Sequence, residues 1–426
     1  MESFIKVQKG QNTYQGILLK EDENYLTIKL SSGYNANFKK NNIEILEKKE
    51  IEKKAFSKTS VKIEHNLNLP IITLLHTGGT IASKIDYSTG AVSSKFSPEE
   101  ILSLFPELQE IANIQAKLIG NMASDDMRFE HYNIMLEEIQ KAVSEGSKGI
   151  IISHGTDTLH YTAAALHYAL KNLPIPVILV GAQRSSDRAS SDAFSNLQTA
   201  VKFIAEQEEQ EKKFRRVSIC MHNSISDNSF VILDAINAKK MHSSRRDAFK
   251  QINFKPLAII ENNKTTFSRD ELKTSKPEEK LIISKYDTKL KIGFYKVHPH
   301  TFPQEISNLD FYDAIIFEAT GLGHIPISQM DDFTKLHPKN LEELKKLISK
   351  GKKIVFGVQT VYGQTCLNVY SPGRVLKQTG ILGNQLNLTT ETLFIRTAHL
   401  LSLDKENFEK NWEKNFEGFE LNSFDN

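Results

Sequence analysis

Apolar and polar positions follow different periods in different parts of the chain, and these periods divide it into segments. Residues 1–50 hold short β-rich runs, TYQGILLK, NYLTIKL and NIEILEK, separated by polar turns such as KEDEN. This pattern predicts a small β-barrel module. Residues 51–66 are charged with scattered apolar positions, which is typical of a linker.

From residue 67 onward, apolar strands alternate with helical segments. IITLLHTGG, KGIIISHG and PIPVILVGA have the character of buried strands, whereas LHYTAAALHYALKN and DAFSNLQTAVKFIAEQ have helical spacing. Such alternation predicts a parallel sheet covered by helices over residues 67–265. Polar residues 266–290 are expected to join it to a second β/α unit, residues 291–426. The predicted fold class is α/β, with two parallel-sheet domains behind the small β module.

Composition narrows the class of protein only slightly. The 426 residues include 54 basic and 52 acidic side chains, so the net charge of +2 indicates no overall basic field for nucleic acid. Two cysteines, Cys220 and Cys366, predict neither a disulfide scaffold nor a Cys-based metal site. We therefore expect a reducing, cytoplasmic setting. MESFIKVQKG lacks the apolar stretch of a signal peptide, and no apolar run approaches the ~20 residues of a membrane span.

Two threonine-containing motifs follow predicted strands. HTGGTIAS, residues 76–83, pairs two glycines with a hydroxyl, and HGTDTL, residues 154–159, pairs hydroxyls with a carboxylate. Glycines permit a tight turn and let a ligand approach the backbone, and ligands of open α/β sheets bind at the carboxyl ends of the strands. Helix capping by Thr and Asp is the alternative interpretation of each motif alone.

Strand-end threonines suggest nucleophilic chemistry. A threonine hydroxyl is a weak nucleophile, so it needs a base such as a lysine oriented by an aspartate. Neither motif has the spacing of a phosphate loop, of G-x-G-x-x-G or of G-x-S-x-G. The histidines lack zincin spacing, which favours packed or surface histidines and no metal site.

LHTGGTIA (75–82) and GIIISHGTDTL (149–159) resemble the two signature motifs of the L-asparaginase/glutaminase family. The similarity runs from about residue 68 to about residue 405 and includes GAQRSSDRASSDAFSNL (181–197) and KKMHSSRRDAF (239–249). The resemblance implies an asparaginase-like fold. It also implies a site that borrows groups from a neighbouring copy of the chain, hence a homodimer core.

The resemblance also implies roles for particular residues. Thr80 is the expected nucleophile, and Thr156, Asp157 and Lys240 are expected to supply a hydroxyl, an orienting carboxylate and a proton-accepting amine. Lys240 is preferred over Lys239 because it keeps the family's distance to Phe249.

Three further residues are expected to bind substrate. Tyr87 resembles the tyrosine of the family's mobile lid, whereas Ser124 and Asp125 match the segment that holds the substrate's α-amino and α-carboxylate groups. Relatives often carry a longer Gln or Glu at the position of Asp125.

The N-terminal extension distinguishes branches of this family. IKLSSGYNANF (28–38), FEATGLGHIPIS (317–328) and LNVYSPGRVLKQTGIL (367–382) resemble the branch formed by the D-type subunits of archaeal glutamyl-tRNA(Gln) amidotransferase, and the match loosens after Gly383, in NQLNLTTETLFI. This resemblance implies a glutaminase that supplies ammonia to a partner, the E-type subunit of that amidotransferase. The partner would bind Glu-tRNA(Gln) and use ATP and Mg²⁺ to form Gln-tRNA(Gln), with no cofactor in the present chain.

Two alternatives stay open at this point. A free L-asparaginase with an additional N-terminal module would turn over asparagine without a partner. A non-catalytic binding protein would be inert even with partner and tRNA.

Overall fold

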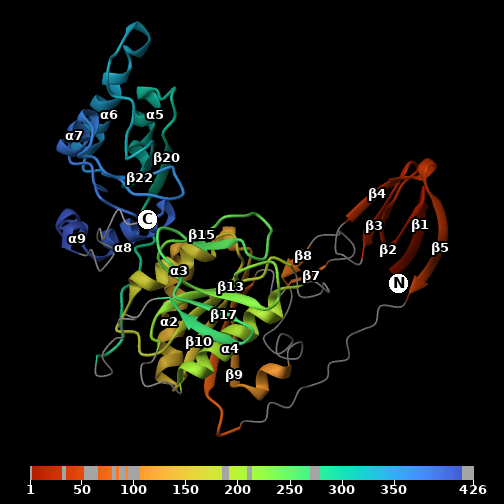
Figure 1. Cartoon of the computed structure of the whole chain (residues 1–426). Helices are drawn as coiled ribbons and strands as arrows, with labels where there is room; N and C mark the ends of the chain where they lie inside the picture. Colours follow the sequence, from red (N-terminus) through yellow and green to blue (C-terminus); the bar gives the residue numbers. More distant parts are fainter. Residues whose placement is uncertain are drawn as a thin grey trace.

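The computed structural model describes most of the chain (Figure 1). The described residues are 2–30, 35–51, 66–78, 83–85, 92–94, 106–184, 191–208, 214–268 and 279–414. Within these ranges no helix is both long and apolar enough to cross a membrane.

The N-terminal segment forms an antiparallel sheet of five strands in the order β4-β3-β2-β1-β5. Their bounds are β1 Glu2–Lys9, β2 Asn12–Glu21, β3 Tyr25–Leu30, β4 Asn35–Lys39 and β5 Glu44–Ile51, and a 3-10 turn, η1, covers Lys40–Asn42. Alternating positions supply its small core of Ile5, Val7, Leu26, Ile28 and Phe38. The edge strands β4 and β5 are not paired with each other in the described residues, so the module is an open sheet there and not the closed barrel that the sequence predicts.

A mixed sheet of eight strands forms the centre of the molecule. In spatial order the strands are β18 (Lys264–Phe267), β17 (Ala258–Glu261), β14 (Ser229–Asp234), β13 (Val217–His222), β12 (Val177–Val180), β10 (Gly149–Ser153), β6 (Ile71–Gly78) and β9 (Asn113–Met122). The strands from β9 to β13 are parallel, as the β-α alternation predicts. Antiparallel β14, β17 and β18 extend one edge.

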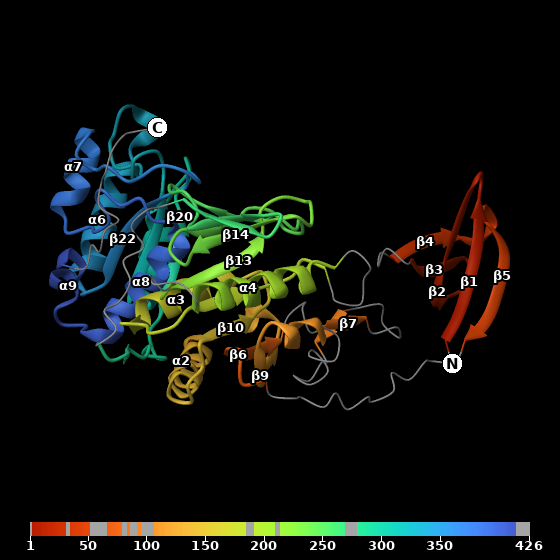
Figure 2. The ribbon, with the colours of Figure 1, turned by 60° about the horizontal axis from the view of Figure 1, so that its bottom comes forward.

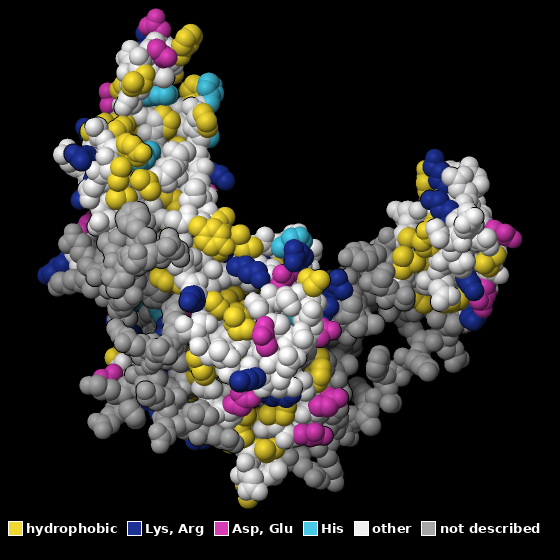
Figure 3. Space-filling model, in the orientation of Figure 1, with side chains coloured by type: hydrophobic (Ala, Val, Ile, Leu, Met, Phe, Trp, Pro, Cys, Tyr) yellow, Lys and Arg dark blue, Asp and Glu magenta, His cyan; other side chains and the backbone are white. Residues whose placement is uncertain are grey.

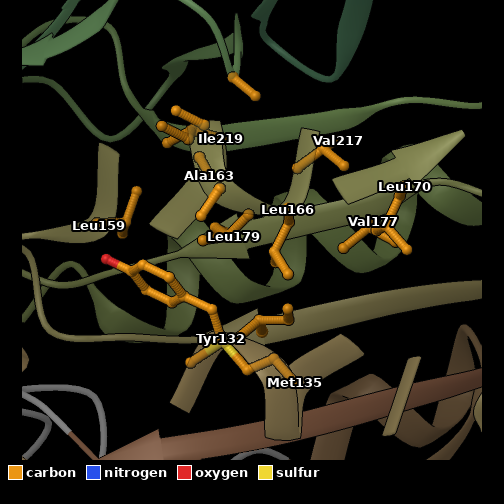
Figure 4. Packing of buried hydrophobic residues seen from close by; sticks show 14 of the residues in the cluster. Tyr132, Met135, Leu159, Ala163, Leu166, Leu170, Val177, Leu179, Val217 and Ile219 are labelled. Atoms are coloured by element: carbon orange, nitrogen blue, oxygen red, sulfur yellow. The ribbon is translucent and has the colours of Figure 1, made fainter. Parts of the chain in front are cut away.

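Helices cover both faces of this sheet because successive side chains of its strands point to opposite sides. The helices are α2 (Phe129–Ser144), α3 (Leu159–Ala169) and α4 (Ala193–Glu208), and Figure 2 shows α3 and α4 running alongside the strands. Ile150 and Ile152 of β10 pack with α2 and α3, whereas Ile151 packs with α4. Figure 4 shows Tyr132 and Leu166 among the side chains of β12 and β13 in the first of these clusters.

The C-terminal unit is built on a three-stranded parallel sheet in the order β20-β21-β22. Its elements are β20 (Ile292–Lys296), α5 (Pro303–Ser307), η5 (Asn308–Phe311), β21 (Ala314–Ala319), η6 (Asp332–Thr334), α6 (His337–Ser349), β22 (Lys353–Val358), α7 (Ser371–Gln378), α8 (Thr390–Leu403) and α9 (Phe408–Lys414). Helices α5, α6 and α7 pack on one face of this sheet, and α8 and α9 on the other. Because α8 also packs against α3, it joins the two units.

Several shorter strands and 3-10 helices lie outside the main elements of the sheets and helices. They are β7 (Ser83–Ile85), β8 (Val92–Ser94), η3 (Pro106–Glu110), η4 (Ser124–Asp126), β11 (Leu170–Lys171), β15 (Ala238–Lys240), β16 (Phe249–Gln251) and β19 (Ile282–Ile283). On the face seen in Figure 3, basic and acidic side chains are interspersed, in keeping with a net charge of +2.

Gly383 is a position where the backbone allows only glycine. Its φ is +102°, and a Cβ built there would lie 2.1 Å from the carbonyl oxygen of Phe356 in β22. Gly351 provides a matched control because its φ is +81° but a Cβ there would meet open space. We expect Gly351→Ala to lower the free energy of unfolding by about 1–2 kcal/mol. Gly383→Ala should cost about 1–3 kcal/mol more, since the backbone of β22 must move. Urea unfolding of the two variants measures this difference, and equal losses would contradict it.

Candidate active site

The strands that lead to the two threonine motifs, β6 and β10, end at the same edge of the large sheet. In the parallel register, Ser153 at the end of β10 lies opposite His76 of β6 and Val180 of β12. The carboxyl ends of β6, β10 and β12 therefore lie side by side, at the edge where open α/β sheets bind ligands.

Thr156, Asp157 and Lys240 come together at this edge. Lys240 Nζ donates to Thr156 Oγ1 at 2.8 Å and to Asp157 Oδ1 at 2.8 Å, although 84 and 83 residues separate the partners in sequence. Thr156 is buried, the Lys240 side chain is 10% exposed, and that of Asp157 is 69% exposed. An amine held between a hydroxyl and a carboxylate can carry a proton to or from a bound substrate.

Close packing fixes the Thr156 loop. A Cβ added to Gly155 would lie 2.8 Å from Cβ of Ser124, and one added to Gly181 would lie 2.7 Å from Cγ2 of Thr156. Larger residues at these glycines would displace the loop, so glycine here sets the position of the Thr156 hydroxyl.

Ser124, one of the residues expected to bind substrate, lies against the same loop. Its side chain is buried, and its Oγ accepts from the backbone N–H of Thr158 at 3.3 Å. The hydroxyl of Thr158 in turn donates to the Ser124 carbonyl. Asp125 follows in η4 and is exposed.

Thr80 and Tyr87 lie outside the described residues. The strand that leads to Thr80 is described as far as Gly78, whose φ is +105°. A Cβ at Gly78 would lie 2.6 Å from backbone atoms of Met122. The first glycine of the HTGGT motif is therefore required by both the turn and a close backbone contact.

Two buried histidines, His76 and His154, support the carboxyl ends of β6 and β10, a role that the sequence does not assign to them. His76 Nδ1 lies 2.5 Å from Ser153 Oγ, and His154 contacts the Gly155 carbonyl through Nδ1 at 2.7 Å and Thr162 Oγ1 through Nε2 at 2.9 Å. Burial lowers the pKa of each histidine to about 4. Both histidines are therefore neutral at pH 7, and their hydrogen bonds hold the neighbouring backbone and hydroxyl groups in place.

Asp192 is a third supporting residue, and the sequence did not point to it directly. Its buried carboxylate accepts from the backbone N–H groups of Gln183 and Arg184 at 3.0 Å, directly before α4. The turn after β12 is thereby held in place beside Thr156. An Asp immediately before a helical pattern, as in SSDAFSN, is the sequence signal that points to such a role.

Comparison with known proteins places the chain in a family. Residues 71–273 match the family model described as asparaginase, N-terminal, and residues 2–47 match that described as GatD N-terminal domain. Two proteins named as the D-type subunit of glutamyl-tRNA(Gln) amidotransferase, from Methanobrevibacter smithii and Pyrococcus furiosus, are 36% and 38% identical to this chain. Each alignment covers 93% of this chain and 88% of the relative.

Solved structures agree on the fold. The thermostable L-asparaginase from Thermococcus kodakarensis superposes with a TM-score of 0.70 at 26% identity, covering 83% of this chain and 100% of that one. The asparaginase-like α/β fold and the distinct N-terminal β module are thus confirmed. The chain belongs to the GatD family, the D-type subunits of glutamyl-tRNA(Gln) amidotransferase.

Proposed function

We propose that this chain is the glutamine-hydrolysing component of a tRNA-dependent amidotransferase that converts Glu-tRNA(Gln) to Gln-tRNA(Gln). The observation that carries the proposal is the similarity over 93% of the chain, N-terminal module included, to proteins named as the D-type component of that enzyme. The Thr156–Lys240–Asp157 group supports the hydrolytic half of the reaction.

The proposed chemistry is an acyl transfer in two steps. Thr80 Oγ1 attacks the side-chain amide carbon of glutamine, the C–N bond breaks, and ammonia leaves with a proton. Water then cleaves the ester to Thr80, which releases glutamate and restores the hydroxyl. Lys240, oriented by Asp157, accepts and returns protons through the Thr156 hydroxyl. Backbone N–H groups of the glycine-containing turn stabilise the oxyanion.

The remaining roles belong to the proposed complex. Tyr87 covers the substrate, and Ser124 and Asp125 hold its α-amino and α-carboxylate groups. The E-type partner binds the tRNA, activates the glutamyl carboxylate with ATP and Mg²⁺ and receives the ammonia. The present chain forms a homodimer core in the cytoplasm, and the near-neutral net charge of +2 agrees with tRNA contacts made mainly by the partner.

The deciding experiment measures ammonia released from glutamine and from asparagine. The full chain is assayed alone and with the E-type partner, Glu-tRNA(Gln), ATP and Mg²⁺, and Thr80→Ala serves as the blank. Glutamine hydrolysis that rises with partner and tRNA, and is absent in the variant, is the expected result. Asparagine hydrolysis indifferent to the partner would instead identify a free L-asparaginase, the alternative that the Thermococcus kodakarensis structure favours.

A further inference from the structure

The strand that carries Lys240 does not belong to the large sheet. β15 pairs only with β16 among the described strands, and the register of this ribbon holds three pairs, the last of which joins Lys240 to Phe249. A two-stranded ribbon of this length is marginal by itself. Other contacts must therefore hold the lysine at its distance from Thr156.

Asn237, directly before β15, supplies such contacts. It is buried and has a left-handed backbone with φ +62°. Its side-chain Nδ2 donates to the Asn387 carbonyl at 2.7 Å, and its Oδ1 accepts from the Thr389 N–H at 2.9 Å. Its backbone N–H donates to Thr392 Oγ1 at 3.2 Å. All three partners belong to the C-terminal unit.

An ion pair reinforces this junction on the other side of β15. Lys239 and Lys240 are successive strand residues, so their side chains point to opposite faces. Lys239 pairs with the largely buried Glu391 at the start of α8. Burial by itself raises the pKa of Glu391, yet the Lys239 ammonium keeps the pKa below its ordinary value. The carboxylate is therefore charged, and the pair joins β15 to α8.

The partners of Asn237 and Lys239 lie in one short segment, residues 387–392. It falls within NQLNLTTETLFI, where the sequence resemblance to the family loosens. Thr389 caps α8 by accepting from the Thr392 N–H, so the helix itself orders the segment. The C-terminal unit thus presents a rigid surface to the ribbon.

We propose that Asn237 is a positioning residue for Lys240, through which the C-terminal unit aligns the proton-carrying amine with Thr156. The inference rests on the proposed function for its catalytic meaning. The structural part, that these contacts fix the Lys240 amine, can be tested without turnover.

Asn237→Gly is the informative variant, because glycine keeps the left-handed backbone and loses both side-chain hydrogen bonds. Asn172→Gly is the matched control, since Asn172 also has a positive φ, of 56°, but lies away from the ribbon.

Two quantities are measured on folded full-length chain. The first is the rate at which acetic anhydride labels Lys240, with peptide fragmentation to separate it from Lys239. The amine is engaged by Thr156 and Asp157, so loosening β15 should raise this rate at least about threefold. The second is kcat for glutamine with the E-type partner present, which should fall about 10- to 100-fold while KM stays nearly constant, because small displacements of a reacting group cost rate.

Each outcome is decisive. Faster labelling in Asn237→Gly, but not in Asn172→Gly, supports the positioning role even if wild-type chain releases no ammonia, which would refute only the proposed function. Unchanged Lys240 labelling in a folded Asn237→Gly chain overturns the inference, whatever the activity.

Discussion

Lys240→Met is expected to lower kcat for glutamine hydrolysis by about 10²- to 10⁴-fold, the range typical of a lost general acid or base. Methionine matches the length and apolar stem of lysine, so the variant should fold. It removes both 2.8 Å hydrogen bonds, to Thr156 Oγ1 and to Asp157 Oδ1. No other described lysine donates to these oxygens, so no neighbour can replace the amine. Ammonia release by the complex, with thermal unfolding measured in parallel, tests the expectation.

Lys264→Met is a suitable control, because Lys264 is an exposed residue of β18. It should retain wild-type kcat. If Lys240→Met also kept its activity, the proton would have to travel by a route that does not include the Lys240 amine. If only KM rose, Lys240 would contribute to binding and not to the chemical step.

Much of the fold could be predicted because it depends on local pattern. The strands β20 to β22 and helix α6 form a β/α unit within residues 291–426, as the alternation of apolar strands and helical segments predicts. The antiparallel edge formed by β14, β17 and β18 could not be predicted. An apolar run indicates burial but carries no information about the direction of a neighbouring strand.

The candidate site was predictable only in part, for a related reason. The motifs point to Thr156 and Asp157, whereas Lys240 is predicted only through the family resemblance, because its proximity to them depends on how distant segments meet in space. Asn237 illustrates the limit most clearly. A buried asparagine with a positive φ looks, in sequence, like any polar residue of a loop, and its partners lie about 150 residues further on.

Lowering the pH from 7 to 5 is expected to destabilise the chain by several kcal/mol. His76, His154, His160 and His399 are buried, and burial lowers the pKa of each to about 4. The pKa of an unfolded histidine is about 6.5. Between these values the unfolded chain binds more protons, so stability is complete above about pH 6.5 and falls as the pH drops toward 4.

The size of this loss of stability follows from the difference between the folded and unfolded pKa of each histidine. At pH 5, which is about 1.5 units below the unfolded pKa, each such histidine costs about 2 kcal/mol. The four histidines together therefore cost an amount comparable to a usual free energy of unfolding of about 5–15 kcal/mol. Unfolding on acidification should begin near pH 5, before most carboxylates are protonated.

His399→Leu isolates one of these contributions. The ring packs between Tyr168 and Tyr286, with centroids 6.0 and 5.8 Å away, and its Nε2 has no hydrogen-bond partner in the described part of the chain. Leucine fills a similar volume on α8 and cannot titrate. The variant should therefore lose about 2 kcal/mol less than wild type between pH 7 and pH 5 in urea unfolding. Equal losses in the two proteins would mean that the pKa of His399 in the fold is close to its unfolded value, and that the acid sensitivity arises at other groups.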